Sequence, residues 1–306
     1  MDNVYIGVDV GSAYITIGAI TDKGKIIKKK SVNLSRTIGD GVSFIDAIIE
    51  SIYLFINDIN LSIHEIESVG LGFPGTVDSK KGIIVFAPNM FFTNFEVKQI
   101  LEQAFDCPIY IGQDSRVAAW GEYNAGRGEN HNNFALIKLD VGIGCGIVIN
   151  GLLYHGPFNT AGEFGHQLID VDGPQCNCGR RGCLETYCGK KAIETAGEEI
   201  KEGLKLKDIY ILAQQGDDKA LRITDQVVEK LGIGIVNLVN LLSLELIAIS
   251  GWINDAPDEL LLNPLREFVR THAYPAIAHK VEIIRSVLGN DAPLIGAALQ
   301  DETTEY

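Results

Sequence analysis

The sequence has few cations for its length. Its 306 residues include 26 lysines and arginines against 40 aspartates and glutamates, which gives a formal net charge of −14. Nonspecific binding to nucleic acid or to anionic lipid depends on cations that displace counterions. We therefore expect no nucleic-acid partner and no membrane partner. The one dense basic stretch, Lys23 to Lys30, is more typical of a solvated strand end than of a polyanion site.

Long apolar runs and an export signal are also lacking. No run approaches the ~18 residues of a membrane-spanning helix, and the stretch from Ile233 to Ile249 is interrupted by polar residues such as Glu245. Met1 leads within five residues into a strand pattern at Ile6 to Val10, without a charged leader or a cleavage site. We expect a cytoplasmic protein with reduced thiols, so its six cysteines need an explanation other than disulfides.

The pattern of apolar residues indicates an α/β protein of two related halves. A hydrophobic content of 46% and a length of 306 residues allow two globular domains. Residues 1–115 predict three strands joined by turns, a helix over 44–56, a strand over 69–75, a helix over 95–105 and a strand over 109–111. After a helix over 116–123, strands are predicted over 134–139, 146–149 and 152–154, separated by glycine turns. Further helices are predicted over 190–202, 207–214, 217–242 and 258–271. Two such units predict a duplicated α/β fold with a cleft between its halves.

Four residues of metal-binding types cluster in one polar segment. They follow the spacing His-x9-Cys-x-Cys-x4-Cys and are His166, Cys176, Cys178 and Cys183. One imidazole and three thiolates make a closed tetrahedral set of the kind that structural zinc takes, with no open position for hydrolysis. The alternative is a loop of independent reduced thiols. Free cysteines usually pack in cores, whereas this segment is polar, so we predict zinc here. The other cysteines lie in apolar contexts and are predicted to be packing residues: Cys107, Cys145 and Cys188.

Three carboxylates have positions suited to binding a polar ligand. Asp114 follows the predicted strand over 109–111 and precedes the predicted helix from Arg116. Ligands of α/β folds bind at this edge of the sheet, so Asp114 is a candidate general base, although an aspartate in this position is more often the N-cap of the helix. Glu163 and Glu185 flank the cysteine segment. They are either surface charges or acceptors for the hydroxyl groups of a polyol.

Two specific motifs stand in the second half of the chain: Gly162-Glu163-Phe164-Gly165-His166 and the run from Cys176 to Glu185. Further short motifs extend over nearly the whole chain: Gly72 to Gly75, Ala87 to Asn89, Ala118 to Glu122, Gly142 to Gly144, Ile147 to Gly151, Leu288-Gly289 and Ile295 to Ala297. Together these motifs resemble those of the ROK family, the bacterial sugar kinases and sugar-responsive repressors, and they fall where that family's motifs fall.

The resemblance implies an actin/hexokinase-like (ribonuclease H-like) fold of two α/β domains around a central cleft. The smaller domain is expected over 1–114, with the closing segment 293–306 packed back on it. The larger domain is expected over 115–292 and contains the zinc loop, 162–189. A homodimer is the default expectation for the family.

The same resemblance implies ATP-dependent phosphorylation of a hexose or a related sugar, with magnesium as the second cofactor. Asp114 would be the general base that takes the proton from the attacking hydroxyl. The implied sugar contacts are Gly75, Asn89, Gln113, Asp114, Glu163, His166 and Glu185, with His166 also serving the metal. The implied nucleotide contacts are Asp9, Gly11, Ser12, Gly142, Gly144 and Gly251.

The nucleotide motifs nevertheless depart from the family pattern together. Ser12-Ala13 and Asp140-Val141 each stand where the family carries Gly-Thr, so two hydroxyl donors are lost and an anion is added near the expected phosphates. Trp252 occupies the expected adenosine turn and would either fill that space or stack on the base, and Gln113 replaces an asparagine. The retained Asp114 favours a working sugar kinase. The alternative is a non-catalytic sugar sensor with a degenerate ATP site. No helix-turn-helix segment precedes Val4, so we do not expect a DNA-binding repressor.

Overall fold

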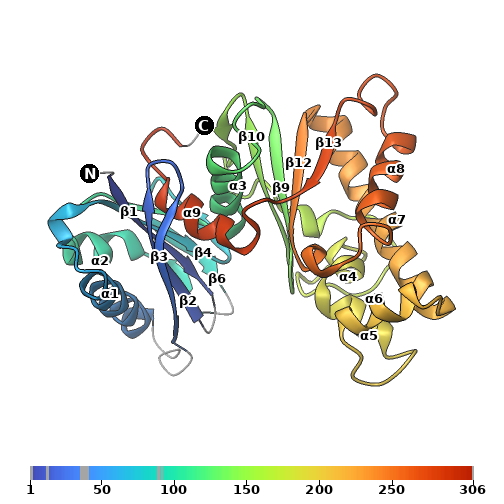
Figure 1. The fold of residues 1–306 in the computed structure, drawn as a ribbon, viewed down its shortest axis with the longest axis horizontal. Coiled ribbons are helices and arrows are strands. Elements are labelled where there is room, and N and C mark those ends of the chain that lie inside the picture. Colours follow the sequence, from blue (N-terminus) through green and yellow to red (C-terminus); the bar gives the residue numbers. More distant parts are fainter. Residues whose placement is uncertain (1–2, 12–13, 35–40, 88–89, 91, 305–306) are drawn as a thin grey trace. The chain divides into compact units, whose positions relative to one another are not determined.

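The computed structural model describes residues 3–11, 14–34, 41–87, 90 and 92–304 (Figure 1). Contacts divide the chain into two compact units. The first comprises 1–130, 146–161 and 290–306, and the second comprises 131–145 and 162–289. The helix that begins at Asp114 therefore stands in the first unit, and the domain limits 1–114 and 115–292 stay a prediction. Among the described residues, no helix is long and apolar enough to cross a membrane.

A five-stranded mixed sheet forms the first unit's framework. Its strand order is β3 (Ile26–Asn33), β2 (Tyr14–Thr21), β1 (Val4–Val10), β4 (Ile66–Phe73) and β8 (Ile109–Gln113). The three strands predicted at the start of the chain pair as an antiparallel meander, and β1, β4 and β8 run parallel. The parallel strands are almost wholly buried, as near-continuous apolar runs such as Val69 to Phe73 predict.

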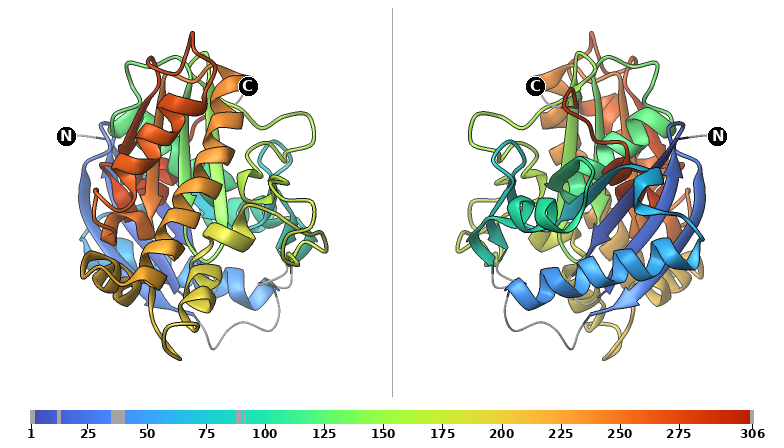
Figure 2. Two further views of the ribbon diagram at one scale, coloured as in Figure 1. Left: turned by 90° about the vertical axis from the view of Figure 1, so that its right-hand side faces the viewer. Right: turned by 90° about the vertical axis from the view of Figure 1, so that its left-hand side faces the viewer.

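Helices cover both faces of this sheet. Side chains alternate along β1, so that Ile6 and Val8 join the core beneath α1 (Gly41–Asp58) and α2 (Val97–Ala104). The right-hand view of Figure 2 shows α1 lying across the blue strands. The opposite face carries α9 (Ala292–Ala298), where Leu294 and Ala298 pack against Ile20 of β2.

Two glycines allow α9 to approach its neighbours closely. A Cβ atom at Gly70 of β4 would lie 1.8 Å from the carbonyl oxygen of Ala297, and one at Gly296 would lie 1.6 Å from that of Val117. Any larger residue would push α9 away from β4 and from α3 (Asp114–Ala125). These close contacts place α9 against β4, which is the neighbour of β8 in the sheet, and against α3, the helix that begins at Asp114.

The second sheet repeats the strand order of the first. It reads β11 (Leu152–Leu153), β10 (Ile143–Ile149), β9 (Phe134–Leu139), β12 (Leu246–Gly251) and β13 (Glu282–Arg285). As in the first sheet, the outer pair β10–β11 is antiparallel, and β12 is parallel to both β9 and β13. The equal strand order, with the same directions in the pairs β10–β11, β9–β12 and β12–β13 as in their counterparts, confirms the predicted duplication of the α/β unit.

The second unit's helices follow the predicted order with shifted ends. They are α4 (Glu185–Cys188), α5 (Lys190–Gly197), α6 (Leu206–Gln214), α7 (Asp218–Leu242) and α8 (Leu262–His272). Asp217 caps α7 by accepting hydrogen bonds from the N–H groups of Lys219 and Ala220. Predicted helices over 190–202 and 258–271 are too long, because the chain turns at Glu198 and has no helical turn before Leu262.

A small three-stranded sheet was not predicted from the sequence. It consists of β5 (Thr76–Asp78), β6 (Ile83–Ala87) and β7 (Phe92–Phe95), paired antiparallel in that order. Single 3₁₀ turns occur at η1 (Ile63–Glu65), η3 (Phe164–His166), η4 (Trp252–Asp255) and η5 (Gly289–Asp291). These three strands lie in the segment of the chain between Gly75 and α2.

Candidate functional site

The predicted site residues of the first unit gather at the carboxyl ends of its parallel strands. Asp9 of β1 pairs with Gly72 of β4, and Phe73 of β4 pairs with Gln113 of β8. Gly75 follows β4 by two residues and has a φ of 94°. This edge is where ligands bind in open α/β sheets. Two further predicted contacts, Ser12 and Asn89, lie outside the described residues.

Asp114 is the first residue of α3 and not its N-cap. Gln113 holds the N-cap position and makes no side-chain cap, so the N-cap interpretation of Asp114 is wrong, and the helix begins two residues earlier than predicted. Asp114 Oδ1 accepts hydrogen bonds from the N–H of Ser115 at 2.7 Å and from its hydroxyl at 3.2 Å. The positive end of the helix dipole favours a negative charge here. A carboxylate held in this way can accept a hydrogen bond from a ligand hydroxyl.

The second unit places its predicted nucleotide residues at the equivalent edge. Asp140 and Gly142 follow β9, and Gly251 ends the neighbouring strand β12. Gly251 has a φ of 90°, and a Cβ atom there would lie 1.8 Å from the carbonyl oxygen of Leu139. A glycine is therefore required at this position by the packing of β12 on β9. Gly144 lies within β10.

The loop after β9 directs its backbone N–H groups at acceptors of the chain itself. The N–H of Val141 donates to Asp140 Oδ1, and that of Ile143 donates to Glu185 Oε2, both at 2.9 Å. The N–H of Asp140 donates to the carbonyl of Gly142 at 2.9 Å. In phosphate-binding loops such groups point at phosphate oxygens. In this loop, two of these N–H groups already donate to carboxylates of the chain.

Two further features of this edge are unsuited to phosphate. The side chain of Val141, which replaces a hydroxyl donor, is 66% exposed and apolar. The Asp140 carboxylate at the same turn would repel an anionic ligand. In the first unit, the N–H of Gly11 is likewise bonded, to the carbonyl of Tyr14 at 2.9 Å. The residues described do not fit a triphosphate as the family's phosphate loops would.

Trp252 fills space in the second unit and offers no stacking surface. It is 6% exposed at the start of η4, and its ring centroid lies 6.5 Å from that of Tyr210, which is also buried. Of the two roles considered for this tryptophan, the geometry therefore supports filling. Within the described chain, Trp252 Nε1 and the Tyr210 hydroxyl have no hydrogen-bond partner. Such buried polar atoms cost stability.

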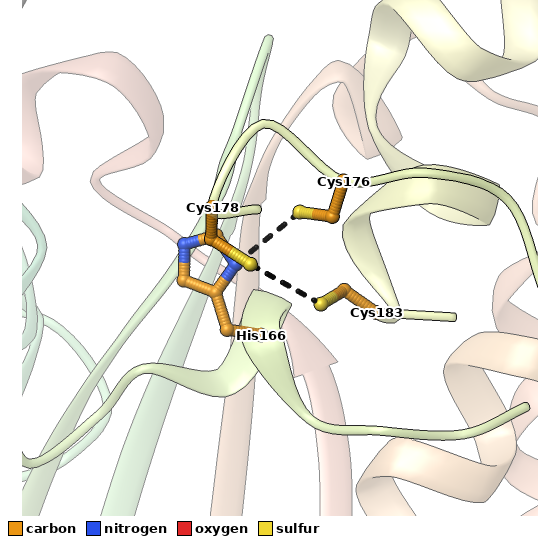
Figure 3. Close-up of side chains that lie close together, drawn as sticks. All are labelled: His166, Cys176, Cys178 and Cys183. Atoms are coloured by element: carbon orange, nitrogen blue, oxygen red, sulfur yellow. Dashed lines mark hydrogen bonds between the residues drawn. The ribbon is translucent and has the colours of Figure 1, made fainter. Parts of the chain in front are cut away.

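The four predicted metal ligands lie together in the second unit (Figure 3). Their ligand atoms are all within 4.8 Å of one another. His166 Nδ1 lies 3.7 Å from Cys176 Sγ, and Cys178 Sγ lies 3.7 Å from Cys183 Sγ. Tetrahedral zinc, with Zn–S bonds of about 2.3 Å, separates its sulfurs by roughly 3.8 Å. The donor set and its spacing fit zinc, and the sulfurs are too far apart for a disulfide.

Turns with glycines hold this zinc loop, defined here as 162–189. The N–H of Cys176 donates to the carbonyl of Arg180 at 2.7 Å, closing a tight turn around Gly179, whose φ is 85°. A Cβ atom at Gly182 would lie 1.5 Å from the carbonyl oxygen of Asp170. The Tyr187 hydroxyl of α4 donates to Asp170 Oδ2 at 2.7 Å.

His166 is placed for both predicted roles because its two ring nitrogens face different partners. Nδ1 faces the cysteines, whereas Nε2 lies 4.0 Å from Glu163 Oε2. Glu163 precedes η3, and Glu185 is the first residue of α4, directly after the ligand Cys183 and Leu184. A metal held by this loop would fix the positions of all three polar groups through the backbone.

The other three cysteines lie outside this cluster, as predicted. Cys145 and Cys188 are fully buried, and Cys107 is half-buried. Burial raises the pKa of Cys145 to about 12 and also raises the pKa of Cys188. Both thiols are therefore protonated at neutral pH and act as small packing groups.

The architecture identifies the class of protein. Two α/β units with the same strand order, and ligand-type residues at the carboxyl ends of their parallel strands, define the actin-like sugar kinase fold. The ROK family model matches residues 5–301, and the chain belongs to that family.

Its relatives divide into enzymes and regulators. A glucokinase of Halalkalibacterium halodurans is 35% identical, with 96% of this chain and 94% of that protein aligned. A xylose repressor of Bacillus spizizenii is 33% identical, with 95% of this chain and 75% of that protein aligned. The crystal structure of a ROK glucokinase from Streptomyces griseus, with glucose and AMPPNP, is 30% identical, has a TM-score of 0.80, and aligns over 96% of this chain and 98% of that one.

Proposed function

We propose that this ROK protein binds a sugar without phosphorylating it and acts as a non-catalytic sugar sensor. The observation that carries this proposal is the loop after β9. Two of its N–H groups donate to the carboxylates of Asp140 and Glu185, which leaves them satisfied and surrounded by negative charge. An ATP phosphate would have to displace both carboxylates from these N–H groups. The Asp140 carboxylate belongs to the loop itself, so it would stay close to the phosphate and repel it.

The predicted sugar contacts carry the polar groups that bind sugar hydroxyls. Asp114, Glu163 and Glu185 are the hydrogen-bond acceptors for sugar hydroxyls. His166 Nε2, beside Glu163, is a donor, because Nδ1 faces the cysteines that would hold the metal. Gly75 and the amide of Gln113 complete the described contacts; the Gln113 oxygen is buried and has no partner among the described residues. A set of this kind discriminates strongly against analogues that lack one hydroxyl, because it leaves the matching group unpaired.

Zinc belongs to this proposal as a structural ion. His166, Cys176, Cys178 and Cys183 would hold it, and four protein ligands leave no position for a substrate or an activated water. Its contribution is to order the loop that carries Glu163 and Glu185. Sugar affinity should therefore depend on the metal although the metal does not touch the sugar.

The second candidate is an ATP-dependent sugar kinase with Asp114 as general base. Its support is the position of Asp114 at the start of α3, at the strand edge where ligands bind, together with the glucokinase relatives. In that case the loop after β9 must rearrange when nucleotide and magnesium bind. Asp114→Asn would then abolish turnover and leave sugar affinity nearly unchanged.

A coupled assay for ADP release, run beside thermal unfolding, separates the two candidates. The full chain is given ATP, magnesium and a panel of hexoses, pentoses and amino sugars. We expect no turnover above that of a sugar-free control, and a higher melting temperature with at least one sugar. Glu163→Gln should remove that rise, whereas Glu202→Gln, a surface change of the same type, should not. Sugar-dependent ADP release that Asp114→Asn abolishes would establish the kinase instead.

A further inference from the structure

The zinc loop contains one cysteine that is open to solvent. Of the chain's six cysteines, all of them within the described residues, only Cys178 is exposed. Its neighbours in the cluster, Cys176 and Cys183, are 3% and 1% exposed. Oxidants reach cysteine sulfurs according to exposure and thiolate character, and a zinc-binding cysteine is a thiolate. When the loop holds its metal, Cys178 is therefore the ligand that a small oxidant meets first.

Cys178 lies at the tip of a turn that leaves it room to move. The N–H of Cys176 donates to the carbonyl of Arg180 at 2.7 Å, and the N–H of Gly179 donates to the carbonyl of Cys176 at 3.0 Å. These two bonds close the turn on either side of Cys178. A Cβ atom at Gly179 would have no heavy atom within 4 Å. The tip of the turn is therefore not packed against another segment at this position.

The neighbouring sulfur belongs to a cysteine that is held in place. Cys178 Sγ lies 3.7 Å from Cys183 Sγ (Figure 3). The backbone of Cys183 forms an antiparallel bridge with Leu168, and the N–H of Leu184 donates to the carbonyl of Gln167 at 2.9 Å. A disulfide needs an S–S distance of about 2.0 Å, so the two sulfurs must approach by about 1.7 Å. Movement of the exposed tip supplies this approach while the buried Cys183 stays in place.

We infer that Cys178 is a site of reversible oxidation by a peroxide, with Cys183 as its resolving cysteine. The Cys178 thiolate attacks one oxygen of hydrogen peroxide. An S–O bond forms, the O–O bond breaks and hydroxide leaves, which gives a sulfenic acid. The Cys183 thiolate then attacks the sulfenic sulfur and displaces a second hydroxide, so that a disulfide forms. The two cysteines together lose two electrons to the peroxide, and both hydroxides take protons from the buffer.

The disulfide removes two of the four metal ligands. Only His166 and Cys176 remain in the cluster, and structural zinc takes four ligands, so the ion is released. The loop then loses the constraint that positions Glu163 and Glu185. Two thiols of a reductant reverse the oxidation by thiol–disulfide exchange. The effect on sugar binding rests on the proposed function, whereas the oxidation does not.

Peroxide treatment of the zinc-loaded full chain tests the inference. A chromogenic chelator reports released zinc, with a peroxide-free sample as reference, and mass mapping of alkylated peptides identifies the disulfide. We expect release of about one zinc per chain together with a disulfide between Cys178 and Cys183. Dithiothreitol followed by zinc should restore the free thiols and the metal content. Cys107→Ser, which removes a thiol outside the cluster, should behave as the wild type does.

The variant Cys178→His keeps four ligands and removes the exposed sulfur. An imidazole in place of this thiolate gives a set of two cysteines and two histidines, which also holds structural zinc. We expect the variant to bind about one zinc and to retain it at a peroxide concentration that releases zinc from the wild type. The peptide map of the wild type decides the pairing whether or not this variant holds zinc.

Three results would overturn the inference. They are zinc retained with all thiols free after peroxide treatment, a peptide map that shows no disulfide between Cys178 and Cys183, and equal zinc release from the wild type and from Cys178→His. Zinc release and the peptide map do not use a sugar, so their failure is distinct from failure of the proposed function. If oxidation releases zinc but the sugar-induced rise in melting temperature persists, the modification site stands and the role of the zinc loop in sugar binding is wrong.

Discussion

The zinc loop and the loop after β9 are both glycine-rich turns of the second unit, yet their polar groups are arranged in opposite ways. In the zinc loop, turns at Gly179 and Gly182 direct one imidazole and three thiols towards a common point (Figure 3). In the loop after β9, the N–H groups of Val141 and Ile143 are bonded to the chain's own carboxylates. In the first region the ligand atoms of four side chains gather around one point, whereas in the second the N–H groups are bonded within the chain.

This difference shows that the binding capacity of a family motif depends more on its hydrogen-bond donor groups than on its glycines. Gly142 and Gly144 are present, but the hydroxyl is replaced by Val141 and a carboxylate is added at Asp140. The backbone can still form the turn, because glycines permit it. Whether the turn can bind a phosphate depends on whether its N–H groups are already bonded to acceptors of the chain.

The largest effect is expected from removing a zinc ligand. Cys178→Ser should lower the zinc content from about one ion per chain to near zero, lower the melting temperature, and weaken sugar binding at least about tenfold. Metal analysis by mass spectrometry, thermal unfolding and calorimetry measure the three quantities. Cys107→Ser, a thiol outside the cluster, should change none of them. If wild-type protein prepared without chelator contains no zinc, the predicted zinc site of this loop is wrong.

The second effect concerns the framework behind Asp114. His155, which faces Arg116, Lys80 and Asp78, has a pKa of about 4, below its ordinary value of 6.5. Protonation therefore favours the unfolded chain, so the stabilisation is complete above pH 6.5 and is lost as the pH falls towards 4. Between pH 7 and pH 5 the loss is about 2 kcal/mol.

Urea unfolding at several pH values measures this loss. Because carboxylates titrate mostly below pH 5, the comparison is made between wild type and His155→Gln, whose free energy of unfolding should change by about 2 kcal/mol less over the same interval. Parallel curves for the two proteins would show that burial and the neighbouring Arg116 do not hold His155 neutral.

The third effect is a gain of nucleotide affinity when the family's residues are restored in the loop after β9. Asp140→Gly combined with Val141→Thr removes the carboxylate and restores a hydroxyl, so affinity for a nucleotide triphosphate should rise at least about tenfold. Calorimetry with AMPPNP and magnesium measures it. Asp172→Gly with Val171→Thr is the matched control, because it alters another exposed acid and valine pair in the same unit. An equal rise in both double variants would remove the special role of Asp140.

The smallest effect compares two tyrosines under the same substitution. The Tyr210 hydroxyl is buried with no partner in the described part of the chain, whereas the Tyr187 hydroxyl donates to Asp170 and braces the zinc loop. Tyr210→Phe should leave the free energy of unfolding unchanged or raise it slightly, and Tyr187→Phe should lower it by about 1 kcal/mol. Chemical denaturation measures both. A clear loss in Tyr210→Phe would mean that its hydroxyl is satisfied in solution.

Much of the framework could be predicted from the sequence, because it depends on local patterns. β9 has the predicted bounds, since a continuous apolar run is flanked by Asn133 and Asp140. The metal cluster was predicted because its four residues lie within one short segment whose spacing is typical of zinc. β10 is longer than predicted, because Gly144 and Gly146 weaken the strand pattern.

Other features depend on contacts between distant segments and gave no sequence signal. Arg116 and His155 are 39 residues apart and follow no spacing rule, so the hydrogen bond between their side chains was not predicted. The bond from Ile143 to Glu185 spans 42 residues. The sheet of β5 to β7 was missed because Gly82 and Pro88 interrupt its short strands. The helix start at Asp114 was misplaced because Gln113 is not a preferred N-cap residue.

The most direct test of the central claim measures nucleotide binding to the sugar-saturated wild-type protein. Calorimetry with AMPPNP and magnesium is performed after saturation with the sugar that gives the largest rise in melting temperature. The account predicts clear heat for the sugar and none for AMPPNP up to millimolar concentration. Saturable AMPPNP binding at micromolar concentration, together with sugar-dependent ADP release from ATP, would contradict it.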